Sequence, residues 1–118
     1  MNTDEYKKLC RQPNAFSRGE LEITRRTLQE KNLHIALRLS DILLNFSITK
    51  PKKHIGDKFT DYFLIDLPEP EVEIIIDVFT DLEVQSVGDD GTTTPLANFY
   101  TEMVDKWTRY LSFVEIQE

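Results

Sequence analysis

The chain has 118 residues, which fits one domain, and 40% of them are apolar, which is enough for one hydrophobic core. Its net charge is −7, and its apolar runs are too short to cross a bilayer, so no membrane partner is expected. The single cysteine, Cys10, cannot form an intramolecular disulfide, and the polar N-terminus lacks the apolar core of a signal peptide. A reducing, cytoplasmic location is therefore expected.

Charge is distributed very unevenly along the chain. Residues 1–58 contain 12 Lys and Arg against 7 Asp and Glu, whereas residues 59–118 contain 2 against 14. The two parts therefore carry net charges of +5 and −12. This asymmetry argues against nucleic acid as the main partner and favours a basic protein. The alternatives are that the two parts face each other, or that folding mixes their charges.

The first part of the chain begins with two predicted helices. A short one runs from Asp4 to Arg11 and is ended by Pro13. Ser17 and Glu20 then have the S-x-x-E spacing of a capping box, in which each side chain bonds the backbone amide of the other residue. We therefore predict a second helix over residues 18–31.

A third, strongly apolar helix is predicted from Leu33 to Phe46. Asn32 separates it from the preceding helix, and we expect this residue to adopt the left-handed conformation. So short a break predicts an αα-hairpin. Apolar residues surround most of the third helix, which is typical of a central helix. His34 on this helix is interpreted as a core or boundary residue rather than a catalytic base.

A loop and a connector follow. Pro51 and Gly56 interrupt residues 48–60, which are predicted to form a basic loop. Its basic residues are Lys50, Lys52, Lys53, His54 and Lys58. We interpret it as solvated, with a weak phosphate contact or an internal ion pair as the alternatives. Residues 62–67 are aromatic and branched, but no convincing partner strand exists, so they are interpreted as an extended or short helical connector.

Two long helices are predicted in the last part. Prolines that fit only a first turn precede a helix from Glu71 to Val87. Thr94 before Pro95 is an N-cap with proline at the first helical position. The last helix, from Leu96 to Val114, repeats apolar residues at three-and-four spacing over nearly five turns.

The predicted fold is an all-α bundle of four main helices plus a short N-terminal helix, in a single domain over residues 1–118. The helices from Leu33 to Phe46 and from Leu96 to Val114 form its centre, because they have the strongest apolar patterns. The basic loop and the extended connector join the second main helix to the third.

The sharpest functional feature is a row of acids at the fourth main helix. Glu69, Glu73, Asp77 and Asp81 recur every four residues and so share an arc of about 120°. The helix contains no Lys or Arg to offset their repulsion. Such a row is solvated, pairs with basic residues of the same chain, or binds a basic protein. We predict partner binding by these four residues together with Asp66.

Motifs for catalysis and metal binding are missing from the sequence. There is no G-x-S-x-G, no Gly-rich phosphate loop and no H-E-x-x-H. The two histidines and one cysteine lack zinc spacing, and Asp89-Asp90-Gly91 lacks the alternating acids of a calcium loop. Cys10 has no evident activating base and is interpreted as a small apolar filler. We therefore expect no catalytic residue, no metal and no cofactor.

In its small size, acidity and missing active site the chain resembles toxin-immunity and other inhibitor proteins, although no motif identifies a family. This resemblance implies a non-catalytic module that blocks a basic partner, such as a toxin enzyme, by covering its charged surface. The alternative is a homo-oligomeric structural or regulatory protein that associates through its apolar C-terminal tail of Phe113, Val114 and Ile116. A third hypothesis is an enzyme with an unrecognised site, which a pocket containing His34 or clustered carboxylates would support.

Overall fold

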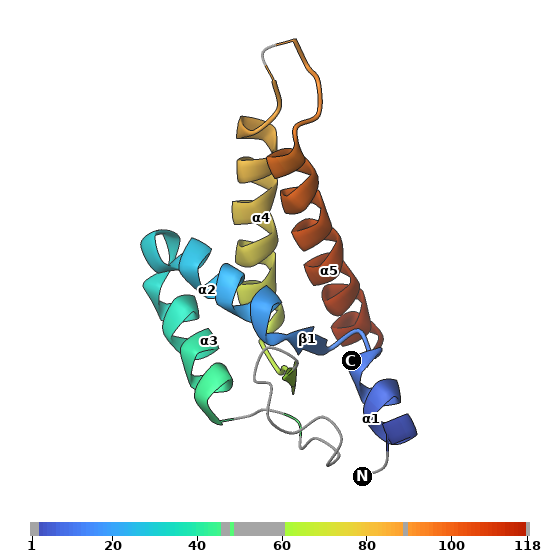
Figure 1. The fold of residues 1–118 in the computed structure, drawn as a ribbon. Coiled ribbons are helices and arrows are strands. Elements are labelled where there is room, and N and C mark those ends of the chain that lie inside the picture. The colour runs from blue at the N-terminus through green and yellow to red at the C-terminus, as the bar shows by residue number, and fades with distance from the viewer. Residues whose placement is uncertain (1–2, 46–47, 49–60, 89, 118) are drawn as a thin grey trace. The chain divides into compact units, whose positions relative to one another are not determined.

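The computed structural model describes residues 3–45, 48, 61–88 and 90–117, which form five helices and one two-stranded sheet (Figure 1). This mostly helical content agrees with the predicted class. None of the described helices is long and apolar enough to span a membrane. The chain divides into two compact units, Met1–Asp66 and Leu67–Glu118. The four-helix bundle and the single domain stay predictions.

The first unit contains α1 (Thr3–Cys10), β1 (Ala15–Ser17), α2 (Arg18–Lys31), α3 (Leu33–Asn45) and β2 (Tyr62–Leu64). The helices α2 and α3 pack side by side, as the predicted αα-hairpin requires (Figure 1). Their buried residues are Leu21, Thr24 and Leu28 on α2, and Ile35, Ala36, Leu39, Ile42 and Leu43 on α3. The basic side chains at positions 50–58 lie outside the described residues.

The strand β2 pairs with β1 in an antiparallel sheet. Phe16 lies opposite Phe63, and both side chains are fully buried. The amide of Arg18 continues the pairing by donating to the carbonyl of Asp61 at 3.0 Å. The connector is therefore extended, as predicted, and part of it is a strand. The partner strand, β1, was not predicted because it has only three residues and ends where the capping box begins.

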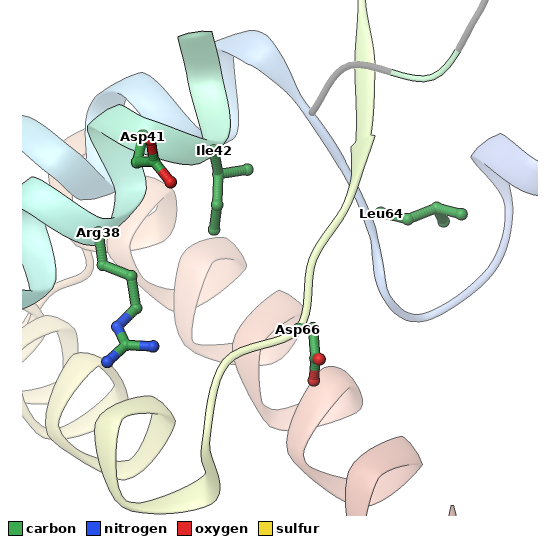
Figure 2. A pocket seen from close by; sticks show the side chains of 5 residues that line it. All are labelled: Arg38, Asp41, Ile42, Leu64 and Asp66. Atoms are coloured by element: carbon green, nitrogen blue, oxygen red, sulfur yellow. The ribbon is translucent and has the colours of Figure 1, made fainter. Parts of the chain in front are cut away.

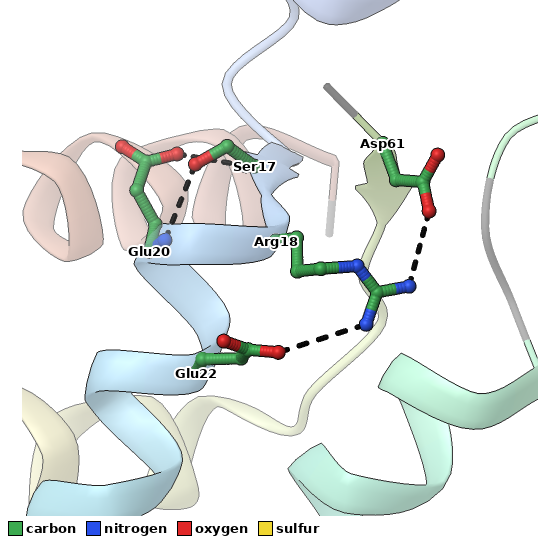
Figure 3. A network of polar contacts seen from close by, with 5 residues as sticks. All are labelled: Ser17, Arg18, Glu20, Glu22 and Asp61. Atoms are coloured by element: carbon green, nitrogen blue, oxygen red, sulfur yellow. Dashed lines mark hydrogen bonds and ion pairs between the residues drawn. The ribbon is translucent and has the colours of Figure 1, made fainter. Parts of the chain in front are cut away.

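Caps define both ends of α2. The amide of Glu20 donates to Ser17 Oγ at 3.2 Å, and the amide of Ser17 donates to Glu20 Oε1 at 2.8 Å, which confirms the predicted capping box (Figure 3). The left-handed prediction for Asn32 is wrong, since its φ is −155°. Instead, Asn32 Oδ1 accepts from the amide of Ile35 at 3.2 Å. Asn32 thus caps the start of α3, a role that requires extended backbone.

Arg18 joins α2 to the sheet. Its Nη2 lies 3.1 Å from Asp61 Oδ2, and its Nη1 lies 3.7 Å from Glu22 Oε1 (Figure 3). The guanidinium also lies 5.2 Å from the centroid of the Phe63 ring, within the range of a cation–π interaction. Two carboxylates therefore neutralise the charge of Arg18 at this position.

The second unit is a hairpin of α4 (Glu69–Gln85) and α5 (Pro95–Gln117). Thr94 is the predicted N-cap of α5, because its Oγ1 accepts from the amide of Ala97 at 3.0 Å. The same hydroxyl donates to the carbonyl of Ser86 at 2.6 Å and so ties the end of α4 to the start of α5. The helix α4 begins two residues before the predicted start, since a first turn does not need the amide that Pro70 lacks.

Aromatic residues pack together within the hairpin. Phe79 and Tyr100 lie with ring centroids 6.1 Å apart, and Trp107 meets Tyr110 edge-to-face at 6.0 Å. The Tyr110 hydroxyl accepts from the amide of Leu67 at 2.8 Å and donates to its carbonyl at 3.2 Å. This buried pair of hydrogen bonds fixes the segment that enters α4.

Candidate partner-binding surface

The four predicted acids of α4 form what we call the acidic face, defined as Glu69, Glu73, Asp77 and Asp81. The last three are exposed, whereas Glu69 is half-buried and interacts with another group. The opposite side of the helix packs into the hairpin through Val72, Ile75 and Phe79, all fully buried. The burial of α4 therefore directs the carboxylates to its outer side.

The second unit itself offers few positive charges to this face. The second unit contains 12 Asp and Glu against only two basic residues, Lys106 and Arg109 on α5. Within the described residues, no ion pair is formed by Glu73, Asp77 or Asp81. The N-terminal end of the helix dipole favours a carboxylate at position 69, but it does not reach the later acids. Three exposed carboxylates thus repel one another along one helix face.

The spacing of the carboxylates is set by the backbone. With a rise of about 1.5 Å per residue, successive acids of the face lie about 6 Å apart along the axis of α4. Packing against α5 and the Tyr110 bonds to Leu67 hold this backbone in position. A charge row on a rigid helix is preorganised, so a partner binds it without an entropic cost for ordering the backbone.

Two apolar side chains accompany the acids and were not predicted to do so. Ile74 is 38% exposed and Val84 is 68% exposed. Val84 follows Asp81 by three residues and Asp77 by seven, so it shares their side of the helix. A helical projection would have found both positions, because neither falls in the arc of the buried residues. Protein interfaces combine an apolar centre with a polar rim, so these two apolar groups add contact area beside the carboxylates.

Asp66 does not belong to α4. It is an exposed residue of the connector in the first unit, where it lines a surface pocket of about 290 Å³ (Figure 2). The other lining residues are Arg38, Asp41 and Ile42 from α3, and Leu64 from β2. Asp66 thus belongs to a different unit from the acidic face, and its part in partner binding stays a prediction.

The residues considered for catalysis belong to the first unit. Burial raises the pKa of the Cys10 thiol, against the effect of a hydrogen bond with Tyr6, which lowers it. A higher pKa leaves less of the nucleophilic thiolate at neutral pH. His34 is exposed, contrary to the prediction of a core or boundary position, and its Nε2 lies 3.5 Å from Arg38 Nη2. No group of three or more potential ligands for a metal is found among the described His, Cys, Asp and Glu residues.

Three comparisons with known proteins complete the description of the site. Neither a protein-family model, nor a curated protein, nor a solved structure matches the chain at a significant level. The chemistry of the surface is thus the basis for a functional proposal.

Proposed function

We propose that the protein is a non-catalytic binding module that engages a basic protein partner through the acidic face of α4. The observation that supports this function is the row of three exposed carboxylates, Glu73, Asp77 and Asp81, without an ion pair to any described residue. Each like-charged pair at this spacing costs a helix a few tenths of a kcal/mol. A partner with Lys or Arg side chains would turn this repulsion into attraction.

An inhibitor of the immunity type would use this surface in a simple way. Opposite potentials accelerate the encounter with a basic enzyme and set the orientation of the complex. The apolar groups of Ile74 and Val84 would then exclude water at the rim of the acidic face. Covering a positively charged substrate site would block the enzyme without any chemistry by the inhibitor.

Site-specific photo-cross-linking in the native cell tests this function. Thr80 is an exposed, uncharged residue of α4 between the carboxylates, so a photoreactive amino acid there leaves all four acids intact. Thr108 is exposed on α5 and serves as the matched control. We expect position 80, and not position 108, to capture one basic protein. Capture of the same proteins from both positions, or of an acidic protein, would contradict the proposal.

A homo-oligomer is the second candidate, and one observation favours it. Ile116 near the end of α5 is 80% exposed, although Phe113 and Val114 are half-buried. An exposed apolar end of a helix is suited to contact with a second copy. Sedimentation analysis separates the two candidates, since a strict monomer at tens of micromolar excludes an oligomeric function.

A further inference from the structure

The outer side of α3 carries a second unusual surface, in the first unit. Leu33, Leu37 and Leu44 are 58%, 61% and 83% exposed. Their spacing of four and seven residues places them on one line, which we call the leucine face, over about 16 Å of helix. An all-apolar helix was expected at the centre of a bundle, but α3 buries only one side in its unit. Large apolar groups gathered in one row on a surface mark a binding site more often than scattered ones do.

A groove lies beside this leucine face, between α2 and α3. Its volume is about 260 Å³. The residues that line it are Arg18, Glu22 and Arg25 from α2, and Ser40, Leu43 and Leu44 from α3. The last leucine of the row thus forms part of the groove, so the apolar line and the groove make one continuous surface.

The charge that remains on this surface is positive. Arg18 is neutralised by its two carboxylate partners. Arg25 is half-buried at the groove and forms no ion pair within the described part of the chain. The groove beside the leucines therefore offers one half-buried basic group, Arg25.

We propose that the leucine face and its groove bind an acidic amphipathic helix of a second protein. Apolar side chains at helical spacing would cover Leu37 and Leu44, and a carboxylate would pair with Arg25. Helix-in-groove recognition uses such an apolar row, and the charge of Arg25 favours an acidic helix over a basic one. The half-buried position of Arg25 strengthens its attraction for a carboxylate, because water screens it less. This surface differs from the acidic face in unit, in charge and in the partner that it fits.

A synthetic peptide tests the proposal on the full chain. The peptide is a fluorescein-labelled helix of about 18 residues, or five turns, with Leu along one face and Glu elsewhere. Fluorescence anisotropy measures its affinity. We expect saturable binding that Leu37→Glu and Arg25→Glu each weaken by at least about tenfold.

Two matched variants control for charge and fold. Leu96→Glu makes the same leucine-to-acid change at an exposed position of α5, and Arg26→Glu makes the same reversal at the exposed neighbour of Arg25. Both should bind the peptide within about twofold of wild type, and circular dichroism checks that all variants are folded. Absence of saturable binding, or equal losses in test and control variants, would overturn the proposal. Concentration-dependent dimerisation abolished by Leu37→Glu would also overturn it, by assigning the face to a second copy.

Discussion

At the scale of single residues, one hydroxyl group holds the start of α4. The Tyr110 hydroxyl satisfies both the amide and the carbonyl of Leu67, and all of these groups are buried. Tyr110→Phe leaves a buried amide without a partner, so we expect a loss of about 1–3 kcal/mol in the free energy of unfolding. Urea denaturation followed by circular dichroism measures this loss.

Tyr100→Phe is the matched control for that substitution. Tyr100 is a half-buried residue of the same helix, and its hydroxyl has no hydrogen bond to a described residue. Its removal should change the free energy of unfolding by less than about 0.5 kcal/mol. Equal losses in the two variants would show that the bonds to Leu67 do not stabilise α4.

The N-cap of α2 gives a second prediction at this scale. Ser17→Ala removes the acceptor of the Glu20 amide, which should cost about 1 kcal/mol. The same measurement on Ser112→Ala, at an exposed position of α5, should show no loss. If the two variants are equally stable, the cap does not contribute. This cap was predictable from the sequence because it depends on four consecutive residues.

A third prediction concerns alkaline pH. Burial, followed by the nearby Cys10, raises the pKa of Tyr6 to about 12. A tyrosine in the unfolded chain titrates near pH 10. Between about pH 10 and pH 12 the unfolded state therefore loses a proton that the folded state keeps, and folding stability falls as the pH rises. Urea midpoints across this range should fall less in Tyr6→Phe than in wild type, whereas parallel declines would refute the assignment.

At the scale of elements, repulsion among the carboxylates of α4 lowers the stability of the protein, and a single substitution can remove it. Asp77 has Glu73 four residues before it and Asp81 four residues after it. Asp77→Lys turns two unfavourable pairs into favourable ones, which should stabilise the protein by about 0.5–1 kcal/mol. Thermal denaturation at low salt measures this gain, and about 1 M salt should abolish it.

Asp105→Lys on α5 is the control for this gain. Asp105 has Glu102 three residues before it and Arg109 four residues after it, so the reversal exchanges one favourable neighbour for another. No net change in stability is expected. A gain of similar size in both variants would attribute the effect to net charge rather than to the acidic face.

Some features of the helices and strands were predictable from the sequence, and others were not. The helix boundaries of α2 were predictable, because its capping box and Asn32 mark both ends. The pairing of β1 with β2 was not predictable, because contact between segments more than 40 residues apart leaves no local pattern in the sequence. The row of acids was found from its period of four, but its exposure depends on which side of α4 packs against α5.

At the scale of the whole molecule, the charge asymmetry follows the division into units. The unit Met1–Asp66 has 12 basic and 9 acidic residues, and Leu67–Glu118 has 2 and 12. Their net charges are therefore +3 and −10. Folding of the first unit pairs Arg18 with Asp61 and Glu22, whereas the second unit keeps its large excess of acids. The predicted placement of α3 at a common centre depended on long-range packing, which a pattern of apolar residues does not specify.

Binding to the basic protein captured from position 80 tests the central claim most directly. Isothermal titration calorimetry would compare wild type with the double variant Glu73→Lys/Asp77→Lys over a range of salt concentrations. The control is Glu102→Lys/Asp105→Lys, which changes the net charge equally on α5.

We predict that the affinity of the wild type falls steeply as the salt concentration rises. The α4 variant should bind at least about 100-fold more weakly than wild type, a loss of ~2.7 kcal/mol in binding free energy. The affinity of the α5 control should stay within about threefold of wild type. Affinity that is indifferent to salt and to both charge reversals on α4 would contradict a function carried by the acidic face.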